Sequence, residues 1–350
     1  MGEGLTYAPA NFGLIFLLLN MTSRWKLSST DSSTLEEQEP LIPIEDRRLY
    51  SQGASTTKIP PPLSNVMADL ENHDREIIHV DYTDFDAAHV GRYGGWVGCF
   101  RKYRAKYRDA LAEFIGTMIL ILLTCGVSAE QTLHISNRSW LTSSFGGGFA
   151  VLCAVSVAGH ISGAHINPAV TLTFWAYSGF PLRKVITYWI AQFLGAFAGA
   201  ALLYSVVEPA ITQFDGGVRQ ILGDHGTAGI FATYPPLYVG TGAAVASEII
   251  GTALLLLIVM ATGHPNNLPY SNFQGGMIAA GVTTICLALG YTSGFSLNPA
   301  RDIGPRIFTA IAGWGIDVFT VRDYYAVVPM FAPLVGGLIG GLVFTIFIDQ

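Results

Sequence analysis

Charged side chains are scarce in this sequence of 350 residues. Asp, Glu, Lys and Arg make up 13% of it and apolar residues 51%, whereas about a quarter of an average soluble domain is charged. The charges are concentrated before residue 110 and thin out afterwards. This profile excludes an ordinary soluble domain and is typical of a membrane protein with several spans. The net charge of −6 belongs mainly to the charged head and the loops, and we expect no nucleic-acid partner.

Signals for metals, cofactors and enzymatic chemistry are also missing. The four cysteines are Cys99, Cys125, Cys153 and Cys286. They show neither metal-ligand nor disulfide spacing, so the three that lie in apolar stretches are predicted to be buried free thiols. The glycine runs at 146–148 and 336–341 lack phosphate-loop spacing, and in apolar stretches they favour close helix packing. We therefore expect no enzyme, no cofactor and no metal.

Residues 1–100 contain no apolar run long enough to cross a bilayer. The apolar patch at 12–21 is too short to span, and neither a basic residue before it nor a clear cleavage site after it indicates a signal peptide. The patch is left unassigned, with a membrane anchor as the less favoured alternative. Residues 22–98 are rich in Ser, Thr, Pro, Asp and Glu. The segment 1–100 is predicted to be a mostly disordered tail. Its Ser/Thr cluster at 28–34 is interpreted as a solvated linker, with phosphorylation-controlled regulation as the alternative.

The remainder, residues 101–350, contains six sustained apolar stretches. They fall at 110–130, 143–161, 184–207, 242–262, 274–291 and 325–348. Each is close to the roughly 20 residues that a helix needs to cross about 30 Å of hydrocarbon. The basic run "RKYRAKYR" at 101–108 precedes the first span, which predicts a cytoplasmic N-terminus and, with six spans, a cytoplasmic C-terminus. Asn137 then begins an "NRS" glycosylation triplet in the first external loop, although such triplets arise often by chance.

The six spans form an internal repeat. "AEFIGTMILILL" at 112–123 matches "SEIIGTALLLLI" at 247–258, and "GHISGAHINPAV" at 159–170 matches "GYTSGFSLNPAR" at 290–301 with an offset of 131 residues. Repeat 1 covers about 108–208 and repeat 2 about 240–348. Each copy holds three spans, an odd number, so the second copy enters the membrane upside down. The sequence predicts an all-α membrane protein of six transmembrane helices with an inverted 3+3 repeat.

Each repeat contains one Asn-Pro-Ala motif. The two copies are Asn167, Pro168, Ala169 and Asn298, Pro299, Ala300. Asparagine is a preferred N-cap, and proline is well tolerated at the first helical position. The apolar stretches that follow, 168–176 and 299–309, are too short to span and are predicted to be re-entrant half-helices.

Inversion brings the two half-helices together near the middle of the membrane, N-terminus to N-terminus. Both positive dipole ends then point at one place, and both asparagines are expected to aim N–H donors into a central lumen. The non-helical backbone before each motif should line that lumen and present a ladder of carbonyl acceptors. The ladder consists of Gly163, Ala164, His165, Gly294, Phe295 and Ser296.

Two carboxylates lie inside predicted spans, at matching places in the two repeats. Glu113 and Glu248 would be relay groups in a proton-coupled carrier. A structural role, in which they accept hydrogen bonds from the re-entrant segments, is the favoured interpretation.

These motifs resemble the aquaporin or major intrinsic protein family over about residues 108–348. The resemblance implies one pore per subunit, assembly as a homotetramer, a plasma-membrane location, and passive passage of water or small uncharged solutes with exclusion of ions and protons. Within the family, the chain is similar to the glycerol facilitators. The residues that carry this similarity are Phe295, Asp302, Arg306, Pro329 and Met330.

The resemblance also implies which residues form the selectivity constriction. Arg301 matches the pore arginine, Phe295 the aromatic wall and Cys286 a small residue of the fifth span. The position on the second span falls on Gly147, where glycerol facilitators usually carry an aromatic side chain. Phe145 would supply the ring if that span contained a two-residue shift.

A passive channel for glycerol, similar small uncharged solutes and water is the leading hypothesis. A water-selective pore of the same fold is the alternative, because Gly147 and Val207, at two positions where glycerol facilitators commonly carry aromatic residues, leave the selectivity open. A coupled secondary transporter uses inverted repeats too. It would need coupling charges within the bundle, and few are present beyond Glu113, Glu248 and Arg301.

Overall fold

The computed structural model describes residues 102–268 and 270–349, so the tail and the apolar patch at 12–21 lie outside the described residues. Six helical segments in the described part are long and apolar enough to cross a membrane. Their helices are α5 (Arg108–Leu133), α6 (Trp140–Ser162), α8 (Leu182–Asp215), α9 (Thr241–Gly263), α10 (Gln274–Leu289) and α13 (Val327–Phe347). The described residues contain no β-strand, which confirms the predicted all-α class.

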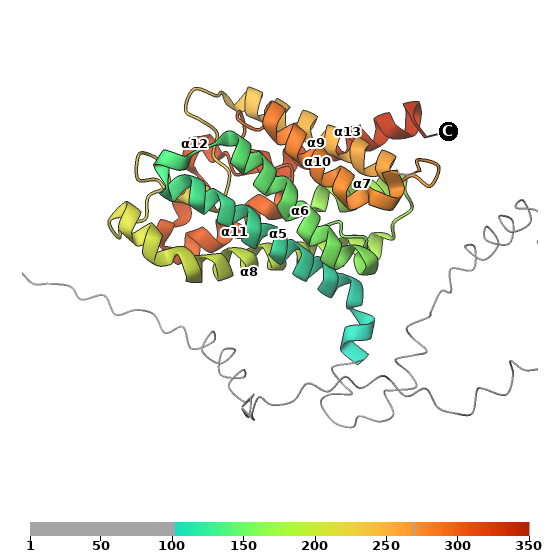
Figure 1. The fold of residues 1–350 in the computed structure, drawn as a ribbon, viewed down its shortest axis with the longest axis horizontal. Coiled ribbons are helices and arrows are strands. Elements are labelled where there is room, and N and C mark those ends of the chain that lie inside the picture. Colours follow the sequence, from blue (N-terminus) through green and yellow to red (C-terminus); the bar gives the residue numbers. More distant parts are fainter. Residues whose placement is uncertain (1–101, 269, 350) are drawn as a thin grey trace, which may run out of the picture. The chain divides into compact units, whose positions relative to one another are not determined.

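Two half-length helices lie among these spans, α7 (Pro168–Tyr177) and α11 (Pro299–Thr309). Figure 1 shows α11 toward one end of the bundle and α7 toward the other. The shorter segments are η2 (Ile135–Asn137), η3 (Ala228–Ile230), η4 (Tyr270–Phe273), η5 (Ala310–Trp314), η6 (Ile316–Val318) and α12 (Val321–Tyr324). We call the end of the bundle that carries the loop 216–240 the long-loop end, and the end that carries Asp349 the C-terminal end.

Five of the expected spans match the helices closely, and the third is longer than predicted. Helix α8 continues to Asp215, past the expected end at residue 207 and through Pro209. Its last turns contain Glu208, Thr212 and Asp215, so hydropathy falls while the backbone stays helical. Gly216, with φ of 68°, then ends the helix in the left-handed conformation that glycine adopts without steric cost.

Glycine pairs hold the outer helices together in the same way in both repeats. An ideal Cβ on Gly195 or Gly199 of α8 would lie 2.3 or 2.5 Å from a backbone oxygen of α5. On Gly336 or Gly340 of α13 it would lie 2.4 Å from a backbone oxygen of α9. These helix axes can approach so closely because glycine has no side chain.

In the glycine run at 146–148, two of the three residues pack against neighbouring helices, whereas the sequence predicted close packing for all three. A Cβ on Gly146 would meet Val127 at 2.6 Å, and one on Gly148 would meet Thr283 at 2.0 Å. A Cβ on Gly147 would meet no atom within 4 Å. Gly146 and Gly148 therefore pack against neighbouring helices, whereas Gly147 faces open space.

The cysteine prediction is correct for two of the three thiols in apolar stretches. Cys125 and Cys286 are buried free thiols. Cys153 is exposed, because it lies on the outward face of α6. An apolar residue of a membrane helix can face lipid as well as the core, so apolar surroundings in the sequence do not imply burial.

Candidate functional site

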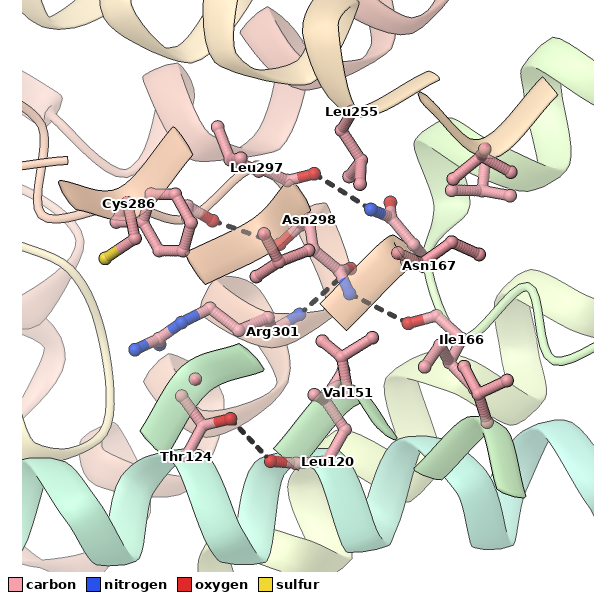
Figure 2. Close-up of a pocket in the computed structure, with 18 of the residues that line it drawn as sticks. Leu120, Thr124, Val151, Ile166, Asn167, Leu255, Cys286, Leu297, Asn298 and Arg301 are labelled. Carbon is pink, nitrogen blue, oxygen red and sulfur yellow. Dashed lines mark hydrogen bonds between the residues drawn. The ribbon is translucent and has the colours of Figure 1, made fainter. Parts of the chain in front are cut away.

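The two half-helices meet through their asparagines. The side-chain oxygen of Asn167 caps α7 by accepting from the backbone N–H of Ala169 at 2.8 Å, and that of Asn298 caps α11 by accepting from Ala300 at 3.0 Å. Each amide nitrogen donates across the junction. Asn167 Nδ2 lies 2.9 Å from the carbonyl oxygen of Leu297, and Asn298 Nδ2 lies 2.8 Å from that of Ile166 (Figure 2).

This reciprocal pair changes the expected role of the asparagines. An amide nitrogen carries two hydrogens, and the crossed bonds use one on each side chain. The second hydrogen remains for the cavity that both Asn167 and Asn298 line. The asparagines therefore lock the two repeats together, and this contact fixes the direction in which the remaining donors point.

Glu113 anchors the non-helical segment before α7. Its carboxylate accepts from the backbone N–H groups of His165 at 2.9 Å and Ile166 at 2.6 Å. Ser162 Oγ at 2.6 Å and Gln192 Nε2 at 2.8 Å donate to it as well. Glu113 is fully buried, and these four donors give its carboxylate the hydrogen bonds that a buried charge needs.

Glu248 does the same for the segment before α11. It is also fully buried, and it accepts from the backbone N–H groups of Ser296 at 3.0 Å and Leu297 at 2.7 Å. The two carboxylates therefore occupy matching places and receive matching backbone donors. This geometry supports the structural interpretation over a proton relay.

The anchored segments have an unusual backbone. Ala164 and Ile166 have φ values of 46° and 44°, and Phe295 and Leu297 have values of 62° and 48°. Left-handed conformations cost non-glycine residues about 1–3 kcal/mol each. The same alternation occurs in both repeats. Ile166 and Leu297 donate their N–H groups to the two carboxylates, and Ala164 and Phe295 donate theirs to the hydroxyls of serines two residues earlier.

A cavity of about 730 Å³ passes this junction and extends toward both ends of the bundle. Its lining begins with Gln131 and Thr132 at the long-loop end and reaches His264 and Asp349 at the C-terminal end. Every residue of the two expected carbonyl segments contributes to the lining: Gly163, Ala164, His165, Gly294, Phe295 and Ser296.

The residues expected at the constriction lie together on this cavity. Arg301, Phe295, Cys286 and Gly147 all line it. Arg301 donates from Nη1 to the carbonyl oxygen of Phe231 at 2.9 Å, and Figure 2 shows its guanidinium extending away from the two asparagines. Only 8% of Arg301 is exposed, so its charge is held in place beside the cavity.

Phe145 is placed elsewhere. It is 47% exposed and stacks on Phe149, one turn further along the outer face of α6, and it is not among the residues that line the cavity. Gly147 therefore lines the cavity and Phe145 does not.

Asp302 and Arg306 form a buried ion pair behind the cavity. Arg306 Nε lies 2.7 Å from Asp302 Oδ1, and both side chains are fully buried. Asp302 Oδ2 also accepts from the backbone N–H and the hydroxyl of Thr233, at 2.7 and 2.6 Å. Arg306 donates to the carbonyl oxygens of Thr233 and Val318, both at 2.7 Å. The pair thus fastens two stretches of the long-loop end onto α11.

The other expected residues lie away from the cavity. Pro329 is buried in α13 and Met330 is partly exposed on the same helix, and neither lines the cavity. Asn137 ends η2, in the connection between α5 and α6.

Several contributors were not predicted from the sequence. Gln192 and Ser162 complete the bonds to Glu113, and Thr233 and Phe231 hold Asp302 and Arg301. Gln192 is a polar residue within an apolar span, which is a detectable signal. Thr233 and Phe231 lie in a loop, and their contacts depend on the path of its backbone. No sequence pattern predicts these contacts.

Comparisons with known proteins agree with this geometry. Residues 100–344 match the family model described as "Major intrinsic protein". The chain is 58% identical to Aquaporin-2 of Rhizopus delemar over 92% of this chain and 100% of that protein. The chain belongs to the major intrinsic protein family. Members of this family are passive membrane channels, so the chain is a channel protein and not an enzyme.

Two aquaglyceroporins are also similar to this major intrinsic protein, one in sequence and one in structure. Aquaglyceroporin-2 of Rhizophagus irregularis is 42% identical to it over 71% of this chain and 78% of that protein. The X-ray structure of the aquaglyceroporin from Plasmodium falciparum superposes with a TM-score of 0.62 and 29% identity, covering 69% of this chain and 96% of the other.

Proposed function

We propose that this channel conducts glycerol and other small uncharged solutes, together with water, and excludes ions and protons. The cavity lined by Arg301, Phe295 and the side-chain-free Gly147 carries this proposal. Arg301 offers donors for solute hydroxyls and repels cations, while Phe295 gives the carbon chain an apolar surface. Cys286 adds little bulk, which leaves room for a solute wider than water.

The remaining roles follow from the same geometry. The second amide hydrogens of Asn167 and Asn298 bind passing oxygens one at a time. The carbonyls of 163–165 and 294–296 act as the acceptor ladder, and Glu113 and Glu248 are structural. The glycerol branch is marked by four residues: Asp302, Arg306, Pro329 and Met330. The ion pair of Asp302 and Arg306 holds the loop segment that lines the pathway in place.

Assembly and location are part of the proposal. The channel is a homotetramer in the plasma membrane with both termini in the cytoplasm. Lys102, Arg104 and Lys106 are exposed at the C-terminal end of the bundle, as the positive-inside bias requires for this orientation. Asn137 then lies at the external end, where a glycan could be attached.

Stopped-flow light scattering on proteoliposomes tests the function. We expect fast glycerol entry alongside fast water movement, and no proton leak above that of empty liposomes. Fast water movement with glycerol excluded would establish the water-selective alternative instead. Glycerol flux that requires an ion gradient would indicate a coupled transporter.

Cys286 gives an independent check on the position of the constriction. A bulky thiol reagent should block flux in the wild type and not in Cys286→Ser. Block that persists in this variant would place the sensitive thiol elsewhere, and Cys153, exposed on α6, provides the control variant Cys153→Ser.

A further inference from the structure

One face of helix α6 lines the cavity along most of its length. The residues on this face are Trp140, Ser143, Gly147, Val151 and Val155, spaced three or four apart as one side of a helix requires. Gly147 leaves a gap in this wall, because an added Cβ there would meet no atom within 4 Å. Trp140 lies two turns further toward the long-loop end and is the aromatic residue of this face.

The indole of Trp140 is fixed in position. Its Nε1 donates to the carbonyl oxygen of Cys286 at 3.1 Å. Ser144 strengthens this link, because its hydroxyl lies 2.8 Å from the carbonyl oxygen of Trp140 and 3.2 Å from Cys286 Sγ. The first turn of α6 is thereby tied to α10 at the residue that we place in the constriction.

Trp140 also comes close to Phe295. An ideal Cβ on Gly290 would lie 2.9 Å from Cζ2 of Trp140 and 3.0 Å from Cβ of Phe295. The two aromatic side chains therefore converge on Gly290, which has no side chain to separate them. Both line the cavity, one from repeat 1 and the other from repeat 2.

We propose that Trp140 is a specificity-determining residue whose indole, held at Cys286 and Gly290, supplies the aromatic surface of α6, two turns from the gap at Gly147. Trp140 and Phe295 lie on either side of Gly290 and give the cavity two neighbouring aromatic side chains at the long-loop side of Arg301. The carbon chain of an unbranched polyol passes along this pair while Arg301 binds its hydroxyls, and longer or bulkier polyols are retarded at Trp140. This inference rests on the proposed function and names the residue that limits solute size.

Trp140 is 40% exposed, so a second role as an aromatic anchor at the membrane interface must be separated from a role in selectivity. The probe is the ratio of erythritol to glycerol permeability in proteoliposomes, because a ratio within one preparation does not depend on how much folded protein it contains. The variants are Trp140→Ala, which removes the wall, and Trp140→Phe, which keeps a ring but loses the Nε1 donor. Leu141→Ala is the matched control, because Leu141 is the next residue, is 56% exposed and does not line the cavity.

We expect Trp140→Ala to raise the ratio by about threefold or more, a change of ~0.7 kcal/mol in relative barrier height. Trp140→Phe and Leu141→Ala should stay near the wild-type ratio. An unchanged ratio in Trp140→Ala, with glycerol still conducted, would overturn the inference and leave the proposed function intact. Equal effects of the Ala and Phe variants would also overturn it, because the hydrogen bond and not the ring would then matter. A wild-type protein that excludes glycerol would instead refute the proposed function.

Gly290→Ala keeps the test decisive if Trp140→Ala fails to fold. The added methyl group would lie 2.8 Å from the carbonyl oxygen of Cys286, 2.9 Å from Cζ2 of Trp140 and 3.0 Å from Cβ of Phe295, so it displaces the end of α10 as well as the two aromatic side chains and narrows the space between them. We expect it to lower erythritol permeability more than glycerol permeability. An unchanged ratio in this variant would count against the aromatic pair.

Discussion

The two repeats of this channel are alike where they build the fold and unlike where they line the pathway. Glu113 and Glu248 anchor equivalent segments, and Asn167 and Asn298 cap equivalent half-helices. The repeat offset of 131 residues, however, places Val170 opposite Arg301. Both residues line the cavity, one apolar and one charged.

The same contrast holds for other residues of the lining. The positions equivalent to Phe295, Cys286 and Gly147 are Ala164, Val155 and Ile278, and all of these line the cavity. Shared residues thus produce the inverted architecture, and residues that differ give the long-loop side of the pathway its charge and its aromatic wall. We propose that fold and selectivity are carried by separate sets of residues in one repeated unit.

The largest effect should come from the ion pair that repeat 2 alone possesses. Asp302→Ala leaves the buried guanidinium of Arg306 without its carboxylate, and breaking a buried pair in this way costs about 3–5 kcal/mol. We expect a large drop in thermal stability, measured by scanning fluorimetry in detergent. In repeat 1 the equivalent residue is Thr171, and Thr171→Val should cost much less. Similar losses of stability in the two variants would contradict the stabilising role of the Asp302–Arg306 ion pair.

Replacing the buried carboxylate of Glu113 should destabilise the protein more than replacing that of Glu248. A glutamine has one acceptor oxygen, so Glu113→Gln leaves two of four donors unpaired. Glu248→Gln leaves one of two backbone N–H donors unpaired, and the hydroxyl of Ser293, the third donor to Glu248, can rotate to another acceptor. Each unpaired buried donor costs at least about 1 kcal/mol, which predicts losses of about 2 and 1 kcal/mol. Thermal unfolding of both variants checks the order, and a more severe effect at Glu248 would show that the accounting of donors is wrong.

Filling the gap on α6 should change transport more than stability. The Cβ of the new side chain in Gly147→Trp meets no atom within 4 Å, and because Gly147 lines the cavity, the indole should enter the pathway and narrow it while the protein still folds. We expect glycerol permeability to fall about tenfold, equal to ~1.4 kcal/mol, with a smaller fall for water. Phe145→Ala is the control on the outer face of the same helix. An equal fall in water and glycerol permeability would indicate a blocked or misfolded channel and not a narrower constriction.

The smallest effect belongs to the surface contact between the starts of α5 and α8. Lys184 donates to Asp109, and both side chains are substantially exposed. Exposed ion pairs contribute about 0–1 kcal/mol, so Asp109→Asn should leave stability and flux nearly unchanged in the same assays. A marked loss of flux would mean that this contact controls the C-terminal mouth of the pathway.

Much of the architecture was predictable because it depends on local patterns. Span length, the repeat match and the Asn-Pro-Ala motifs specify six helices, two half-helices and their inversion. The end of α8 was missed, because polar residues can continue a helix after the apolar run ends. The crossed bonds of the asparagines and the contacts of Thr233 and Phe231 depend on how distant segments meet, which spacing along the chain does not encode. Whether Gly147 or Phe145 faces the cavity depends on how α6 is rotated about its own axis, which the sequence does not show.

The most direct test of the division between fold and selectivity compares Arg301→Val with Val170→Ala. Both variants change a lining residue at equivalent places, and proton and glycerol permeabilities are measured in the same proteoliposomes. We predict that Arg301→Val admits protons and alters the glycerol-to-water ratio, while Val170→Ala behaves like the wild type. Proton exclusion that survives in Arg301→Val, or is lost equally in Val170→Ala, would contradict the assignment of selectivity to the long-loop side.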